Sequence, residues 1–214
     1  MTEQSIELDE LEHDALTELV NIGVSRAAVN LRKMVGEQVL LSVPSVEVVT
    51  RRHAVTLIRE RENDDLVAVR QDFDGVFSGR ALLIFPEKNS LALVRAVTHG
   101  TLTDEEAAAM EDEALAETGN IVLNGCLATM ANMLKKSLTM SLPEVIRGGG
   151  KILFELDSRP MPDGVVLFLY INFTINDRNI RGYIAMLMDV PSLATLKTLI
   201  GEFIARVVGG GEKQ

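Results

Sequence analysis

Two segments of the chain combine polar and hydrophobic residues with the period of an α-helix. In residues 11–34, four polar residues recur at intervals of four, three and four positions, which places their side chains on one stripe of a helix. These residues, called here the first ridge, are Asp14, Glu18, Asn21 and Ser25. Small and hydrophobic residues fall on the opposite side, namely Leu16, Val20, Gly23, Ala27, Leu31 and Met34. The segment is therefore predicted to be an amphipathic helix with a buried back and an exposed ridge.

The same pattern returns 99 positions later in the chain. The second ridge consists of Glu113, Glu117, Asn120 and Asn124. Its helix has an apolar back formed by Leu115, Gly119, Val122, Cys126, Met130 and Met133. A strand-like segment with a proline follows each helix, and Pro44 and Pro143 keep the same offset. Agreement in so many features predicts an internal duplication.

The segments outside these two helices predict strands and short helices. Runs rich in valine, leucine and isoleucine are typical of strands. In the first half they are residues 39–50, 53–62, 66–72 and 79–85, and in the second half 136–145, 151–157, 165–175 and 182–189. Ser90 and Ser192 each open a predicted short helix.

Capping signals define where the two long helical segments begin. Asp9 with Glu12, and Thr103 with Glu106, have the spacing of a capping box. The second helical segment is long enough to predict a break near Met110. In the first, Gly36 fits a left-handed cap at the C-terminal end of the helix.

The order of these elements predicts an α+β fold. Strands that follow one another across tight turns pair antiparallel, so the sheet is expected to be mostly antiparallel. The two repeats, at about residues 9–100 and 103–206, are expected to join in one domain spanning 1–214, with 207–214 as a flexible tail. A pseudo-twofold axis would then relate the two long helices on one face of the sheet. Because such internal symmetry replaces a dimer, the chain is predicted to be a monomer.

Composition narrows the possible partners. The formal net charge of −10 disfavours nucleic acid and anionic membrane surfaces, both of which require a basic footprint. No apolar run approaches the roughly 20 residues that a membrane span needs, and the acidic N-terminal segment lacks the apolar stretch of a signal peptide. The predicted location is therefore the cytoplasm. Cys126, the single cysteine, excludes an internal disulfide, and with three histidines no metal site is predicted.

The ridges carry a specific resemblance. Asp14, Glu18, Asn21 and Pro44 together resemble the signature of the CheC/CheX/FliY phosphatases of bacterial chemotaxis. Two such signatures in a chain of 214 residues resemble CheC more than CheX, which has one. The second copy departs from the pattern at Glu113, where the family has aspartate or serine.

The resemblance implies a substrate and a role for each ridge residue. The substrate would be a phosphorylated CheY-type response regulator, with Mg²⁺ bound on the regulator and no cofactor in this chain. An acyl phosphate is already activated, so its hydrolysis chiefly needs a water held in line with the breaking bond. By resemblance, Asn21 and Asn120 orient that water, and Glu18 and Glu117 dock to a lysine of the regulator's active site. The remaining ridge residues are expected to line the docking surface, namely Asp14, Ser25, Glu113 and Asn124. The two prolines, Pro44 and Pro143, are expected to be structural.

A second function class remains open at this point. Flagellar switch proteins use CheC-like domains as non-catalytic adaptors, and such domains lose the Glu/Asn pair that this chain carries twice. CheC proteins also bind the receptor deamidase CheD, which adds CheD as a candidate partner. The leading prediction is an aspartyl-phosphate phosphatase.

Overall fold

The computed structural model describes residues 7–36, 38–62, 65–98, 101–155, 164–175 and 178–210. The helices are α1 (Glu10–Val35), α2 (Arg51–Arg61), α3 (Ser90–Val97), α4 (Asp104–Ala109), α5 (Glu111–Met133), α6 (Gly150–Leu153) and α7 (Val190–Gly210), with a short 3-10 helix at Glu87–Asn89. The strands are β1 (Val39–Thr50), β2 (Leu66–Gly75), β3 (Gly79–Pro86), β4 (Leu138–Met140), β5 (Glu144–Gly148), β6 (Val165–Ile175) and β7 (Arg178–Met188).

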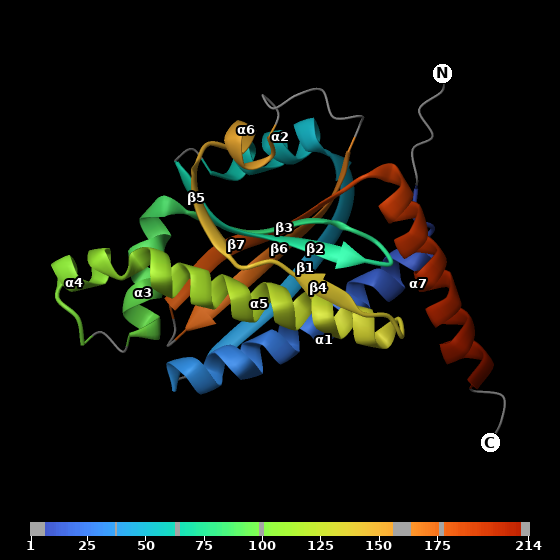
Figure 1. Ribbon diagram of the computed structural model, residues 1–214, viewed down its shortest axis with the longest axis horizontal. Coiled ribbons are helices and arrows are strands. Elements are labelled where there is room, and N and C mark those ends of the chain that lie inside the picture. The colour runs from blue at the N-terminus through green and yellow to red at the C-terminus, as the bar shows by residue number, and fades with distance from the viewer. Residues whose placement is uncertain are drawn as a thin grey trace.

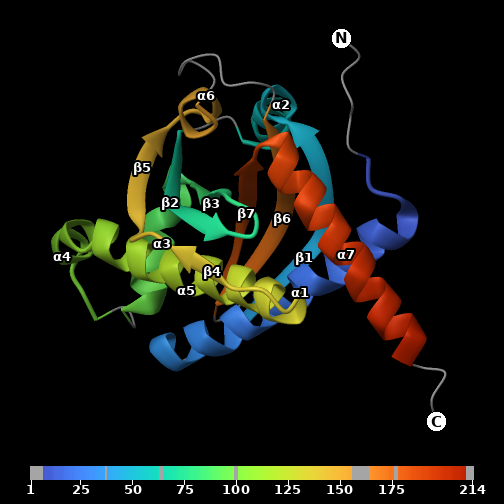
Figure 2. The same cartoon turned by 45° about the vertical axis from the view of Figure 1, so that its right-hand side comes forward.

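One antiparallel sheet forms the middle layer of the molecule. Its strands follow the order β1-β6-β7-β3-β2-β4, and β5 also pairs with β2. Helices α1 and α5 lie side by side on one face, while the short helices α2 and α6 lie on the other (Figures 1 and 2). Helices α3 and α7 share the hydrophobic core of α1 and α5 through residues such as Leu93 and Leu196. This three-layer arrangement places both predicted ridge helices on the same face of the sheet.

The two halves of the chain exchange their outer strands. β1 of the first half pairs with β6 of the second, and β5 of the second half pairs with β2 of the first. At the centre, β3 pairs with β7. A twofold axis between the halves requires this reciprocal pairing. The predicted pseudo-twofold, mostly antiparallel α+β fold is confirmed.

Both prolines lie where an edge strand changes register. The β1–β6 register shifts between Ser42 and Ser45, on either side of Pro44. On the opposite edge, Pro143 lies between β4 and β5, whose registers with β2 differ by one residue. Proline lacks a backbone N–H, so it fits an edge strand at a point where pairing is interrupted. The position of each proline therefore has a structural explanation.

The helix ends follow the capping signals. Asp9 and Glu12 form a capping box at the start of α1, and Gly36 ends the helix with φ 66°. Thr103 and Glu106 form the second box at the start of α4. The predicted break falls at Met110, which separates α4 from α5. These local predictions are confirmed because they depend on neighbours within one helical turn.

The two long helices approach each other closely. Colours in Figure 1 show that α1 and α5 run in opposite directions. A Cβ atom built on Gly23 would lie 2.9 Å from the Cα atom of Cys126, and one on Gly125 would lie 2.9 Å from the Cβ atom of Ala27. Gly119 instead allows α5 to approach the sheet, because a Cβ atom there would lie 2.4 Å from the Val69 side chain. Small residues thus set the distances of α5 to α1 and to β2.

Two predicted strands are helices. Residues 51–61 form α2, although 53–62 was expected to be a strand. Residues 150–153 form α6, which overlaps the start of the expected strand 151–157. Residues 156 and 157 of that prediction lie outside the described residues. In α2 the buried residues are Ala54, Val55 and Ile58, which have helical spacing and cover the second face of the sheet. The valine and isoleucine that suggested a strand serve here as the apolar side of a short helix.

Two further boundaries differ from expectation. The predicted strand 136–145 is divided into β4 and β5 by the register change at Pro143. The helix opened by Ser192 is long, since α7 runs from Val190 to Gly210. Residues 207–210 are therefore helical rather than part of a flexible tail, and residues 211–214 lie outside the described part of the chain.

Membrane insertion was not expected from the sequence. Among the described residues, no helix combines the length and the apolar character needed to cross a membrane.

Cys126 is expected to be unreactive in the folded protein. The side chain is fully buried against α1, and this burial raises the pKa of its thiol to about 12. Since the thiolate is the nucleophile, alkylation by iodoacetamide near neutral pH should be at least about a hundredfold slower in the native than in the denatured chain. Mass spectrometry measures the single modification directly. Comparable rates in the two states would contradict the packing described for α5.

Candidate functional site

The first ridge lies on the outer side of α1, facing solvent. Asp14, Glu18 and Ser25 are exposed, and Asn21 is half-buried. The back of the helix is buried as predicted, with Leu16, Val20 and Leu31 fully inaccessible in the core, although Met34 is only partly buried.

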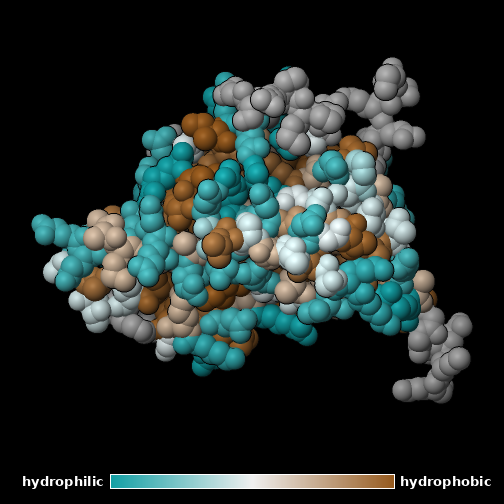
Figure 3. All heavy atoms as spheres, in the orientation of Figure 1, coloured by the Kyte–Doolittle hydropathy of each residue, from teal (hydrophilic) through white to brown (hydrophobic). Residues whose placement is uncertain are grey.

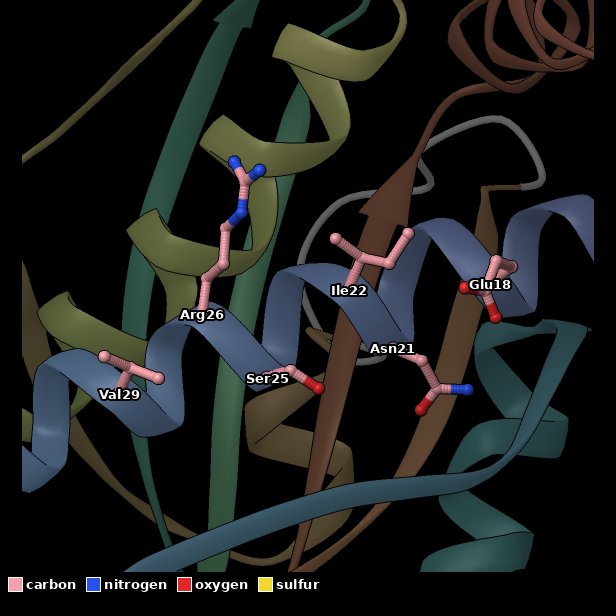
Figure 4. A pocket seen from close by; sticks show the side chains of 6 residues that line it. All are labelled: Glu18, Asn21, Ile22, Ser25, Arg26 and Val29. Carbon is pink, nitrogen blue, oxygen red and sulfur yellow. The ribbon is translucent and has the colours of Figure 1, made fainter. Parts of the chain in front are cut away.

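A shallow pocket of about 330 Å³ opens at the first ridge. It is lined by Glu18, Asn21, Ile22, Ser25, Arg26 and Val29. Figure 4 shows Glu18, Asn21 and Ser25 along one side of α1, whereas Ile22 and Arg26 point to the other side. The pocket therefore combines a carboxylate, a carboxamide and a hydroxyl with a hydrophobic and cationic border.

Contacts between α1 and β1 hold the first ridge in place. The Nε2 atom of His13 lies 2.8 Å from the carbonyl oxygen of Val46. Leu19 and Val24, which flank Asn21 on the buried side of α1, are fully inaccessible. A helix fixed in this way presents its side chains at defined positions, which a mobile loop would not do.

The carboxamide of Asn21 is free to bind an external molecule. No hydrogen bond joins it to any of the residues that the structure describes, so both its carbonyl oxygen and its amide nitrogen remain open. Arg26 likewise has no ion pair within the described chain and borders the same pocket. Sequence reasoning missed Arg26, because a charged residue on an exposed helix gives no signal of its own.

The second ridge is arranged differently. Glu113 and Glu117 are exposed, whereas Asn120 and Asn124 are half-buried. The Asn120 Oδ1 atom accepts a hydrogen bond from Gln71 Nε2 at 3.1 Å and another from Asn124 Nδ2 at 2.5 Å. The two asparagines predicted to be equivalent thus have different surroundings.

Gln71 is a buried polar residue that the sequence did not single out. It lies on β2 with 1% of its surface exposed, and its Nε2 atom also donates to the carbonyl oxygen of Ser141 at 2.8 Å. Ser141 precedes Leu142, whose side chain is 89% exposed beside Pro143. A single glutamine in a hydrophobic strand does not indicate from sequence that it contacts Asn120, which lies 49 positions away on another element.

The surface over α5 is mixed in character. Figure 3 shows hydrophilic and hydrophobic residues interspersed on the face of the molecule where α5 lies in Figure 1. No group of three or more histidine, cysteine, aspartate or glutamate side chains among the described residues is placed to hold a metal ion. Both ridges offer carboxylates and carboxamides for chemistry, and the first ridge adds the Ser25 hydroxyl.

Such groups suit the positioning of water and the pairing of charges. A carboxamide oxygen accepts a hydrogen bond without bringing a charge, and an exposed carboxylate pairs with a cation on a partner. Neither ridge contains a serine or cysteine next to a base that would activate it as a nucleophile. The arrangement favours a reaction in which the partner supplies the reactive group.

Comparisons with known proteins identify the fold class. The structure is similar to that of FliY from Thermotoga maritima, with a TM-score of 0.71, 16% identity, and coverage of 92% of this chain and 98% of that one. It is also similar to the FliM middle domain from H. pylori, with a TM-score of 0.59, 9% identity, and coverage of 90% and 99%. At such identities the similarity establishes the fold alone.

Sequence comparisons find similarity to chemotaxis and flagellar phosphatases. The family model described as "Chemotaxis phosphatase CheX" matches residues 67–160. The flagellar motor switch phosphatase FliY of Bacillus subtilis (strain 168) is 24% identical over 141 residues, which are 65% of this chain and 36% of that protein. This chain therefore spans about a third of the length of that relative. These two matches support the predicted resemblance to the CheC/CheX/FliY phosphatases of chemotaxis.

Proposed function

We propose that this protein hydrolyses the aspartyl phosphate of a phosphorylated CheY-type response regulator. The observation that carries the proposal is the pair of Glu18 and Asn21 at an open pocket on α1. The Asn21 carboxamide makes no hydrogen bond to any described residue. The similarity to chemotaxis and flagellar phosphatases supports the reaction class. The predicted kinship with CheC in particular stays a prediction, as do the monomeric state and the cytoplasmic location.

In the proposed mechanism Asn21 positions the attacking water. Its carbonyl oxygen would accept a hydrogen bond from the water and hold it in line with the bond between phosphorus and the regulator's aspartate. The water oxygen attacks phosphorus, the acyl-phosphate bond breaks, and the aspartate carboxylate leaves with inorganic phosphate as the other product. Mg²⁺ on the regulator would balance the charge of the phosphoryl group. No covalent intermediate on this chain is required.

Glu18 would fix the register of the complex. An exposed carboxylate one helical turn before Asn21 can pair with a lysine in the regulator's active site, which brings the carboxamide to the phosphoryl group. Asp14 and Ser25 would border the contact along the same stripe. The second ridge carries Glu117 and Asn120 in the same order and would serve as a second site.

The alternative is a non-catalytic adaptor, and the similarity to a FliM middle domain gives it a basis in fold. A shared fold does not decide function, which depends on the residues at the site. The Glu/Asn pair is present twice here, and this favours the phosphatase. CheD remains a candidate second partner, proposed from the predicted kinship with CheC.

A turnover assay tests the proposal. The wild-type chain should accelerate the decay of a phosphorylated CheY-type regulator, measured as phosphate release, and the Asn21→Ala/Asn120→Ala protein should lose at least about 90% of that acceleration. Truncation of both carboxamides leaves Glu18 and Glu117 in place, so binding to the phosphorylated regulator should persist. A double variant that is as active as the wild type would rule out the mechanism. Binding to the regulator regardless of phosphorylation, without accelerated decay, would favour the adaptor.

A further inference from the structure

The twofold relation between the halves shows which residue corresponds to Gln71. Val46 and Val145 each stand two positions after their proline, and they pair with Leu169 and Val69 respectively. Leu169 and Val69 are therefore equivalent, with an offset of 100 positions in these strands. The same offset makes Ile171 the counterpart of Gln71.

The first site consequently lacks both groups that bind Asn120. Ile171 is 2% exposed and has no hydrogen-bonding atom in its side chain, so it cannot contact Asn21 as Gln71 contacts Asn120. Ser25 stands where the second ridge has Asn124. The difference between the two sites is thus built into the strand beneath the helix as well as into the ridge itself.

The orientation of the Gln71 amide is fixed by the backbone. Its Nε2 atom lies 2.8 Å from the carbonyl oxygen of Ser141, which is an obligatory acceptor. Turning the amide over would bring two oxygens face to face at that point. The second hydrogen on Nε2 is then directed to Asn120 Oδ1 at 3.1 Å, and this makes the inner atom of the Asn120 carboxamide its oxygen.

This orientation has a chemical consequence at the second site. A carbonyl oxygen has two lone pairs, and those of Asn120 Oδ1 are engaged by Gln71 and Asn124. The amide nitrogen of Asn120 is left without a partner among the described residues. The second site would therefore offer a donor to the regulator, whereas the proposed mechanism needs an acceptor for the attacking water.

We propose that Gln71 is a positioning residue that, together with Asn124, holds the Asn120 carboxamide with its oxygen inward and so restrains the second site. Turnover then arises mainly at Asn21. This inference rests on the proposed function and adds to it an inequality between the two sites. Gln71 Oε1 is buried without a hydrogen bond to any described group, which is unfavourable by about 1–3 kcal/mol. This cost agrees with a Gln71 amide whose orientation is fixed by the contacts of its nitrogen.

The test combines Gln71→Met with Asn21→Ala. Methionine matches the length of glutamine but has no donor, so the Asn120 carboxamide becomes able to turn its oxygen outward. We expect Asn21→Ala/Gln71→Met to exceed Asn21→Ala by about fivefold or more in kcat with KM unchanged, because Glu117 still docks the regulator. Adding Asn120→Ala should abolish the gain. The matched control, Gln71→Met in an Asn120→Ala background, should show no gain.

Several outcomes would overturn the inference. They are equal losses from Asn21→Ala and Asn120→Ala, a gain that survives Asn120→Ala, or no gain in a double variant whose thermal unfolding is normal. If methionine prevents folding, Gln71→Ile replaces it, since isoleucine occupies the equivalent buried position in β6.

A structural readout separates this inference from the proposed function. In the wild type, NMR should show Gln71 side-chain amide protons that exchange slowly with solvent, and Asn120→Ala should accelerate their exchange. A wild-type chain without phosphatase activity would remove the proposed function. Fast exchange in an active wild type would instead remove the role of Gln71 alone.

Discussion

Because turnover is inferred to arise mainly at Asn21, its replacement by aspartate is expected to lower kcat/KM for the phosphorylated regulator by about a hundredfold, or about 2.7 kcal/mol. Aspartate keeps the shape of the side chain and an acceptor oxygen, but it adds a negative charge beside the phosphoryl group. Two like charges 4 Å apart repel by about 4 kcal/mol at an effective dielectric constant near 20, and the open pocket reduces this. Phosphate release under single-turnover conditions measures the effect.

Asn30→Asp is the matched control for this substitution. Asn30 is exposed on the same helix, it does not line the pocket, and the change in net charge is identical. Its activity should remain within about twofold of the wild type, because exposed charges at a distance are screened by salt. An Asn21→Asp protein as active as the wild type would mean that the residue acts as a base or not at all, and the neutral-acceptor mechanism would be wrong.

Gly119→Ala is expected to lower the free energy of unfolding by about 1–3 kcal/mol, the largest effect on stability that we predict from a single methyl group. A Cβ atom at this position would lie 2.4 Å from the Cβ and Cγ1 atoms of Val69. Val69 is β-branched and 1% exposed in β2, so it cannot rotate away without a clash elsewhere. Urea unfolding followed by circular dichroism measures the change.

Gly201→Ala provides the control with the opposite sign. Gly201 lies in α7, and a Cβ atom there meets no other group within 4 Å. Alanine in open space on a helix should stabilise the protein by about 0.5–1 kcal/mol relative to glycine. If Gly119→Ala stabilised the protein as Gly201→Ala does, the close packing of α5 on β2 would be wrong.

The sequence predicted features that depend on short-range spacing. The two ridge helices follow from polar and apolar residues three and four positions apart, and Leu16, Val20, Leu115 and Val122 are buried as that spacing requires. The capping boxes and the break at Met110 depend on groups within a single turn. Such features are set by local geometry, so one sequence is enough to find them.

The same local reasoning failed where two structures fit one composition. Val55 and Ile58 suggested a strand, because β-branched residues are common in strands. In α2, however, the buried residues are Ala54, Val55 and Ile58, which have a helical spacing. Tertiary packing decided between helix and strand for this segment. The second face of the sheet is hydrophobic, and α2 and α6 cover it by packing on residues such as Phe168. A short apolar segment does not contain the information about which surface it will cover.

The sequence by itself determined that the Glu/Asn pair occurs twice, on two exposed helix faces, each followed by a proline. Only the tertiary structure decided that the two pairs differ. Gln71 reaches Asn120 because β2 passes beneath α5, and Ile171 takes the equivalent place in the first site because β6 passes there in the matching register. Strand register joins residues far apart in the chain, and neither spacing nor composition along the chain encodes which side chain will lie beneath a given helix.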